Sequence, residues 1–92
     1  MAISNLGALR TVLMDVITEG VAVIRHKKLL AYLGKSHDRP SVWAQLVDVW
    51  HDDLEQPRET LCGLCVDDKV VLHLPAYSGG DDTKVENWAN KT

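Results

Sequence analysis

The sequence from His26 to Leu54 is HKKLLAYLGKSHDRPSVWAQLVDVWHDDL, and it contains two apolar patterns separated by a polar loop. In the first pattern, Leu29, Leu30 and Leu33 recur at helical spacing. Gly34 follows, and glycine commonly ends a helix because it adopts the left-handed conformation without strain. The first pattern therefore predicts a short helix that begins near His26.

The second pattern predicts a longer helix from about Pro40 to Leu54. Proline is tolerated in the first turn of a helix, where its missing amide would have no partner, and Pro57 would end the helix. The apolar positions form one broad face: Val42, Trp43, Leu46, Val47, Trp50 and Leu54. We expect Trp43 and Trp50, seven residues apart on that face, to lie in the core.

Further elements are predicted on both sides of these helices. A helical apolar stripe runs from about Ser4, a plausible N-cap, to Glu19, and Gly20 would end that helix. Residues 21–24 are suited to a short strand. Two apolar runs, 60–66 and 69–74, are separated by two aspartates, which predicts a hairpin.

These elements predict an α+β fold: three helices followed by a two-stranded antiparallel hairpin, with a short extra strand after the first helix. The element order, together with the phrase LLAYLG at 29–34, resembles the winged helix (helix-turn-helix) superfamily over about residues 4–75. We expect one domain over 1–75 and a C-terminal tail over 76–92, with a possible short helix at 83–90. In that tail, Trp88 either packs on the core and fixes the tail to it, or is exposed and binds a partner.

Composition indicates a single globular domain. The 92 residues are 46% hydrophobic and 25% charged, which is enough for one core that buries roughly two-thirds of the surface. No apolar run approaches the roughly 20 residues of a membrane-spanning helix, and the amino terminus has no signal-peptide pattern. We therefore expect a cytoplasmic protein without a membrane partner.

Charge is divided along the chain. Between residues 25 and 39, one carboxylate, Asp38, opposes five cations: Arg25, Lys27, Lys28, Lys35 and Arg39. Between residues 48 and 68, Arg58 alone opposes seven carboxylates: Asp48, Asp52, Asp53, Glu55, Glu59, Asp67 and Asp68. The folded molecule should be dipolar, and its partners should distinguish the two regions.

Two cysteines, Cys62 and Cys65, have the spacing of a zinc or thiol-exchange pair. On a strand, residues three apart point to opposite faces, so the two thiols would diverge. We favour the interpretation that both act as small hydrophobic residues in or near the core. We expect no metal and no cofactor.

Histidine–carboxylate neighbours invite an acid–base interpretation at His37-Asp38 and His51-Asp52-Asp53. Sequence neighbours on a helix do not face each other, and no serine with the context of a nucleophile lies nearby. We favour solvated polar positions and expect no enzyme and no catalytic residue.

Two binding hypotheses follow, and we place first a small non-enzymatic regulatory domain that binds nucleic acid through residues 25–39. The winged-helix resemblance implies that the third helix enters the major groove of DNA. Its base-reading candidates are Arg39, Ser41 and Gln45, with Arg25, Lys27, Lys28 and Lys35 on the phosphates. Carboxylates on the same helix and at the hairpin tip would repel phosphate, which argues against ordinary docking. A solvated helix face is the simpler explanation of the basic segment.

The alternative is a protein-interaction module, an adaptor or inhibitor, and one form of it would imitate the charge pattern of DNA. It would use the acidic face of the third helix and the hairpin tip against a basic partner. Its contact residues would be Asp48, Asp52, Asp53, Glu55, Asp67, Asp68 and Trp88. An exposed hairpin edge would also offer a surface for a homodimer.

Overall fold

A computed structural model describes residues 4–35, 37, 39–75 and 84–89. The helices are accompanied by a π-helical turn, η1, and a 3₁₀ turn, η2. In chain order the elements are α1 (Leu6–Glu19), β1 (Val21–Arg25), α2 (His26–Tyr32), α3 (Pro40–Asp48), η1 (Val49–Asp53), η2 (Arg58–Thr60), β2 (Cys62–Val66), β3 (Lys69–His73) and α4 (Val85–Ala89).

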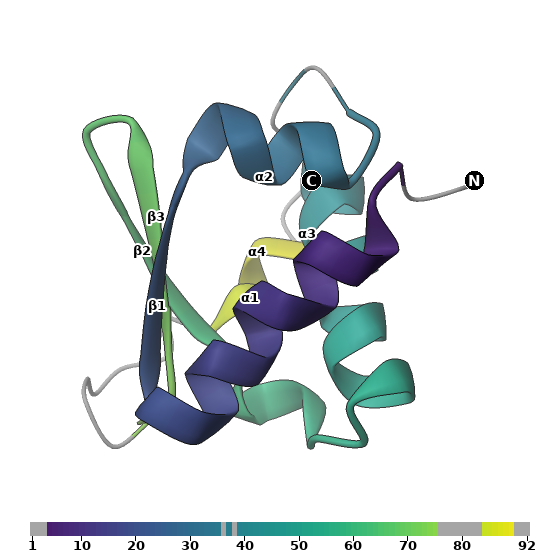
Figure 1. Ribbon diagram of the computed structural model, residues 1–92, viewed down its shortest axis with the longest axis vertical. Coiled ribbons are helices and arrows are strands. Elements are labelled where there is room, and N and C mark those ends of the chain that lie inside the picture. The colour runs from purple at the N-terminus through teal and green to yellow at the C-terminus, as the bar shows by residue number, and fades with distance from the viewer. Residues whose placement is uncertain (1–3, 36, 38, 76–83, 90–92) are drawn as a thin grey trace.

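The three strands form one antiparallel sheet in the order β1-β3-β2. The predicted α+β class is confirmed, and the architecture is consistent with a winged-helix-like domain. The strand after α1 is not an isolated addition to the hairpin, because it pairs with β3 along its whole length. The described helices all lie on one side of the sheet, as Figure 1 shows.

The ends of the helices follow local capping chemistry. Asn5, not the expected Ser4, caps α1, and its Oδ1 accepts the Ala8 N–H at 3.1 Å. Gly20 ends α1 with a φ of 87°, in the left-handed region predicted for it. Gly34, with a φ of 72°, follows α2 in the same conformation.

The third helix is shorter than the expected range of Pro40 to Leu54. α3 ends at Asp48, and the chain continues as η1, in which the Leu54 N–H bonds the Val49 carbonyl at 3.3 Å. A turn with this i→i+5 bond is wider than an α-helical turn. Glu55 then leaves the helix with a positive φ of 57°.

The core lies between the helices and the inner face of the sheet. Trp50 is fully buried and Trp43 nearly so, as predicted. The largest fully buried side chains besides Trp50 are Leu9, Leu13, Leu29, Leu33, Leu46, Leu61 and Leu72. The molecule that is packed around this core measures 30 × 28 × 24 Å.

The helix α4 is docked on this core and falls within the tail range where a short helix was anticipated. The Val85 N–H donates to the Leu61 carbonyl at 3.0 Å, and the Val85 side chain is fully buried. The Trp88 ring meets the Trp43 ring edge-on, with the two centroids 5.0 Å apart. Of the two roles considered for Trp88, these contacts match the one that fixes the C-terminal segment to the core.

Candidate nucleic-acid interface

The amino-terminal half of α2 presents two exposed lysines, Lys27 and Lys28. Leu29, Leu30 and Leu33 turn inward and are buried, so the polar side of this short helix is left outside. The Lys28 Nζ lies 5.9 Å from the centre of the Tyr32 ring, a cation–π distance. The packing of α2 therefore holds these cations on the surface.

The end of the sheet adds two more cations beside α2. Arg25, the last residue of β1, is directly opposite Lys69, the first residue of β3, and both are exposed. The His26 N–H donates to the Asp68 carbonyl at 2.7 Å, which ties the hairpin turn to the start of α2. Lys69 was not among the predicted site residues, because only the pairing of β1 with β3 brings it next to Arg25.

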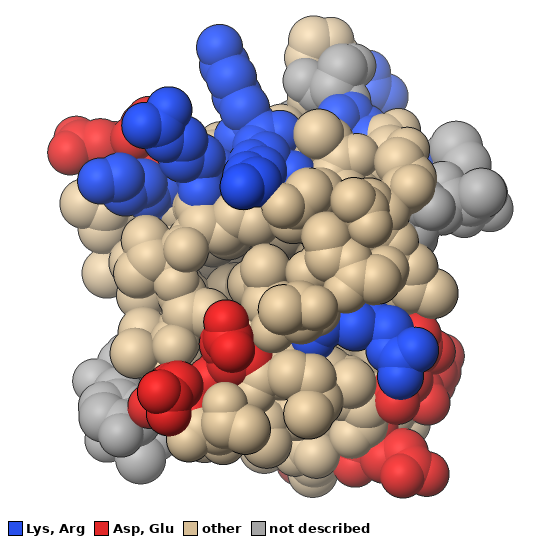
Figure 2. Space-filling view, viewed as in Figure 1, with Lys and Arg blue, Asp and Glu red and all other residues tan. Residues whose placement is uncertain are grey.

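The remaining predicted cations lie in the connection between α2 and α3. Lys35 follows α2, is half-buried, and donates its backbone N–H to the Leu30 carbonyl at 2.9 Å. Arg39 is exposed and immediately precedes α3. Figure 2 shows most of the visible Lys and Arg side chains at the upper end of the molecule, over α2 and the adjacent end of the sheet, with acidic side chains beside them at the upper left and a further basic group at the lower right. We call the following set the basic surface: Arg25, Lys27, Lys28, Lys35, Arg39 and Lys69.

The outward face of α3 is less suited to base edges. Ser41 is exposed in its first turn, but Gln45 is half-buried. The Gln45 Oε1 is buried without a hydrogen-bond partner in the described part of the chain. Asp48 is exposed on the last turn, where its Oδ1 accepts from the Arg58 Nη1 at 3.0 Å. Of the α3 positions proposed to face DNA, only the first turn therefore offers an exposed side chain without negative charge.

The carboxylates of the alternative hypothesis lie in two separate places. Asp52, Asp53 and Glu55 are exposed at the end of η1 and just beyond it. Asp67 and Asp68 form the hairpin turn, which contacts the start of α2 instead. In Figure 2 the red side chains accordingly occur in separate groups. The proposed acidic contact set is not one surface, and the Trp88 ring packs edge-on against Trp43.

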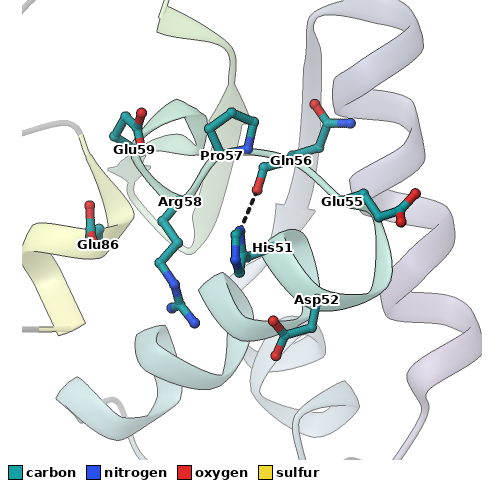
Figure 3. Close-up of a pocket in the computed structure, with 8 residues that line it drawn as sticks. All are labelled: His51, Asp52, Glu55, Gln56, Pro57, Arg58, Glu59 and Glu86. Carbon is teal, nitrogen blue, oxygen red and sulfur yellow. Dashed lines mark hydrogen bonds between the residues drawn. The ribbon is translucent and has the colours of Figure 1, made fainter.

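An open groove lies at the end of η1 (Figure 3). It is lined by His51, Asp52, Glu55, Gln56, Pro57, Arg58, Glu59 and Glu86. The His51 Nδ1–H donates to the Gln56 carbonyl at 3.0 Å, so this imidazole nitrogen is oriented by backbone and not by a carboxylate. Four carboxylates against Arg58 give the groove a negative character. Glu59 and Glu86 line the groove from η2 and α4, two elements that contact each other.

The two cysteines occupy different surroundings. Cys62 is buried at the start of β2, where it also forms a bridge to Lys84, whereas Cys65 is exposed near the hairpin turn. The expectation that both pack as small hydrophobic residues thus holds for Cys62 and is wrong for Cys65. Among the residues that the structure describes, no group of three or more His, Cys, Asp or Glu side chains could hold a metal ion.

Comparison of the chain with known proteins finds no matching family model, no matching curated protein and no matching solved structure. Within the described ranges, no helix is long and apolar enough to cross a membrane.

Proposed function

We propose that this protein is a non-enzymatic regulatory module that binds nucleic acid through the basic surface. The observation that carries the proposal is the convergence of Arg25, Lys27, Lys28 and Lys69 on α2 and the sheet end beside it. Exposed cations in such a cluster attract the phosphate groups of a nucleic acid whatever its base sequence. The winged-helix resemblance supports the same function by analogy of fold. The cytoplasm remains the proposed compartment.

The proposed mode of binding is contact with the phosphate backbone. The first turn of α3 can approach a groove with Arg39 and Ser41, but Asp48 on its last turn would face phosphate and repel it. The basic surface should therefore fix the domain on a duplex while contributing little discrimination between base sequences.

Duplex binding should weaken steeply with salt, because each neutralised phosphate releases a counterion. If about four of the cations contact phosphate, the association constant should fall about 100-fold between 50 and 200 mM salt. Fluorescence anisotropy with a labelled mixed-sequence duplex measures this slope. Absence of binding at the lowest salt concentration would disprove the proposal.

The double variant Lys27→Glu/Lys28→Glu should abolish this binding. It exchanges the two exposed cations of α2 for anions, so attraction to phosphate becomes repulsion. A charge-matched control is Arg10→Glu/Arg58→Glu, which changes the net charge equally but lies on α1 and η2. Equal weakening by both pairs would contradict a localised site and indicate a response to net charge alone.

A second candidate function rests on the acidic groove at the end of η1. Asp52, Glu55, Glu59 and Glu86 there could receive a basic segment of a protein partner. Asp52→Lys/Glu59→Lys, which reverses the charge of two groove carboxylates, should then lose that partner in affinity capture while its far-UV circular dichroism spectrum stays unchanged. Retained capture of the same partner by the folded double variant would contradict this candidate.

A further inference from the structure

The hairpin turn between β2 and β3 places two carboxylates beside the basic surface. Asp67 and Asp68 form the turn and are exposed, and the His26 N–H donates to the Asp68 carbonyl at 2.7 Å. Asp68 is followed directly by Lys69, which is paired across the sheet with Arg25. The turn is therefore fixed at the start of α2, next to the row of two cations at the end of the sheet.

These carboxylates lie within electrostatic range of that row. Consecutive Cα atoms are about 3.8 Å apart, and paired residues of antiparallel strands are about 4.5–5.5 Å apart. The backbone of Asp68 is therefore within about 10 Å of both Lys69 and Arg25, which is one Debye length at about 0.1 M salt. A phosphate that approaches this row meets the repulsion of two aspartates as well as the attraction of two cations.

The α2 side of the basic surface is different. The helix has the sequence HKKLLAY, which contains no carboxylate, and Lys27 and Lys28 are exposed on it. In Figure 2 the acidic side chains beside the upper basic group are at the upper left, where Figure 1 places the turn between β2 and β3. Positive charge is thus offset at the hairpin end of the basic surface and not over α2.

We propose that the Asp67–Asp68 turn is a negative determinant of nucleic-acid binding, which keeps the phosphate backbone over α2 and leaves the hairpin outside the contact. This inference rests on the proposed function. Phosphates reach the row of Arg25 and Lys69 but do not continue past it, because each further step brings them closer to the two aspartates. The hairpin thus orients the nucleic acid by repulsion and not by contact.

The double variant Asp67→Asn/Asp68→Asn removes the repulsion while keeping the shape of the turn. Asp67 has a positive φ of 54°, and asparagine, like aspartate, visits this left-handed conformation more readily than most residues with a side chain. In fluorescence anisotropy with the labelled mixed-sequence duplex at about 50 mM salt, the variant should bind about 10-fold more tightly than the natural chain. The gain should shrink as added salt screens the charges.

The matched control is Asp52→Asn/Asp53→Asn. It neutralises another pair of consecutive, exposed aspartates and so changes the net charge equally. This pair is in η1, outside the basic surface, so the affinity should change by less than about 2-fold. Circular dichroism confirms that each variant is folded before it is compared. Equal gains from the two pairs would overturn the inference, since the duplex would then respond to net charge alone.

A two-dimensional NMR titration with the same duplex locates the contact. In the natural chain the amide signals of Lys27 and Lys28 should shift, whereas those of Val66 and Asp67 should stay in place. In the Asp67→Asn/Asp68→Asn variant the signals of the hairpin turn should shift as well. Shifts at the hairpin turn of the natural chain as large as those in α2 would overturn the inference.

This inference and the proposed function fail in different ways. If the natural chain binds the duplex and Asp67→Asn/Asp68→Asn leaves the affinity unchanged, the inference is wrong and the proposed function stands. If neither the natural chain nor this variant binds at the lowest salt concentration, both are wrong.

Discussion

Replacing Trp50 with alanine should lower the free energy of unfolding by about 3–5 kcal/mol. The side chain is 0% exposed and lies between η1, of which Trp50 is the second residue, and residues 57–60. Its Nε1–H donates to the Pro57 carbonyl and to the Thr60 Oγ1, both at 3.1 Å. Truncation would thus open a cavity and remove the contact that holds residues 57–60 against the helix. For a domain whose total stability is about 5–15 kcal/mol, this loss is severe.

Urea denaturation followed by far-UV circular dichroism measures the loss without relying on tryptophan fluorescence. Trp50→Phe separates the two contributions, since it keeps a ring in the core but removes the N–H donor. It should cost less than alanine, because the Pro57 carbonyl still accepts from Thr60 Oγ1 at 2.6 Å. The neighbouring exposed change Asp53→Ala should stay within about 0.5 kcal/mol. A loss below about 1 kcal/mol for Trp50→Ala would show that the core closes around the gap.

The helices and the hairpin were predictable because their signals are local. Apolar spacing located α1, α2 and α3, and two apolar runs with a two-residue connection located β2 and β3. The cap of α1 and the end of α3 were not predictable in the same way. Ser4 and Asn5 have similar cap propensities, so the choice depends on which one reaches the Ala8 amide. The π-helical turn replaces α-helical geometry from Val49 onwards, and the 3.6-residue period of the apolar positions does not predict such a turn.

The candidate interface was predictable only where its residues are neighbours in sequence. Arg25, Lys27 and Lys28 form one run, and α2 displays them together. Lys69 joins them because of strand pairing, and the same pairing carries Asp67 and Asp68 away from the acidic end of η1. These are contacts between residues more than forty positions apart, and charge counting along the chain does not detect them.

The exposed side of β1 was not predicted, for a different reason. The four residues VAVI at 21–24 are all apolar, and such an uninterrupted apolar run is typical of a strand that is buried on both sides. The structure buries only the inner side, with Ile24 in the core and Val23 exposed. Composition alone therefore could not reveal that half of this run faces outward.

The docking of α4 depends on a site where β2 has no side chain. An ideal Cβ built on Gly63 would lie 2.8 Å from the Trp88 Cη2 and 3.2 Å from its Cζ3. It would also lie 3.3 Å from the Val85 Cγ2. Real Cβ atoms essentially never approach another atom as closely as 2.8 Å, so a side chain at this position and the present place of the indole are incompatible. The absence of a Cβ at Gly63 thus allows α4 to lie against both the sheet and Trp43.

Gly63→Ala should therefore destabilise the protein by about 1–3 kcal/mol, the usual cost of overpacking a close contact. The substitution would displace Trp88 from Trp43, and proteolysis by chymotrypsin should cut the C-terminal segment faster as α4 loosens.

Gly7→Ala is the matched control, because it makes the same change in α1, where the nearest atom to a new Cβ is Asn5 Oδ1 at 3.9 Å. There alanine should stabilise the helix by up to about 1 kcal/mol. Thermal unfolding of the two variants should thus move in opposite directions. If Gly63→Ala were also stabilising, the indole would have to move without cost, and α4 would not be held by the contact described.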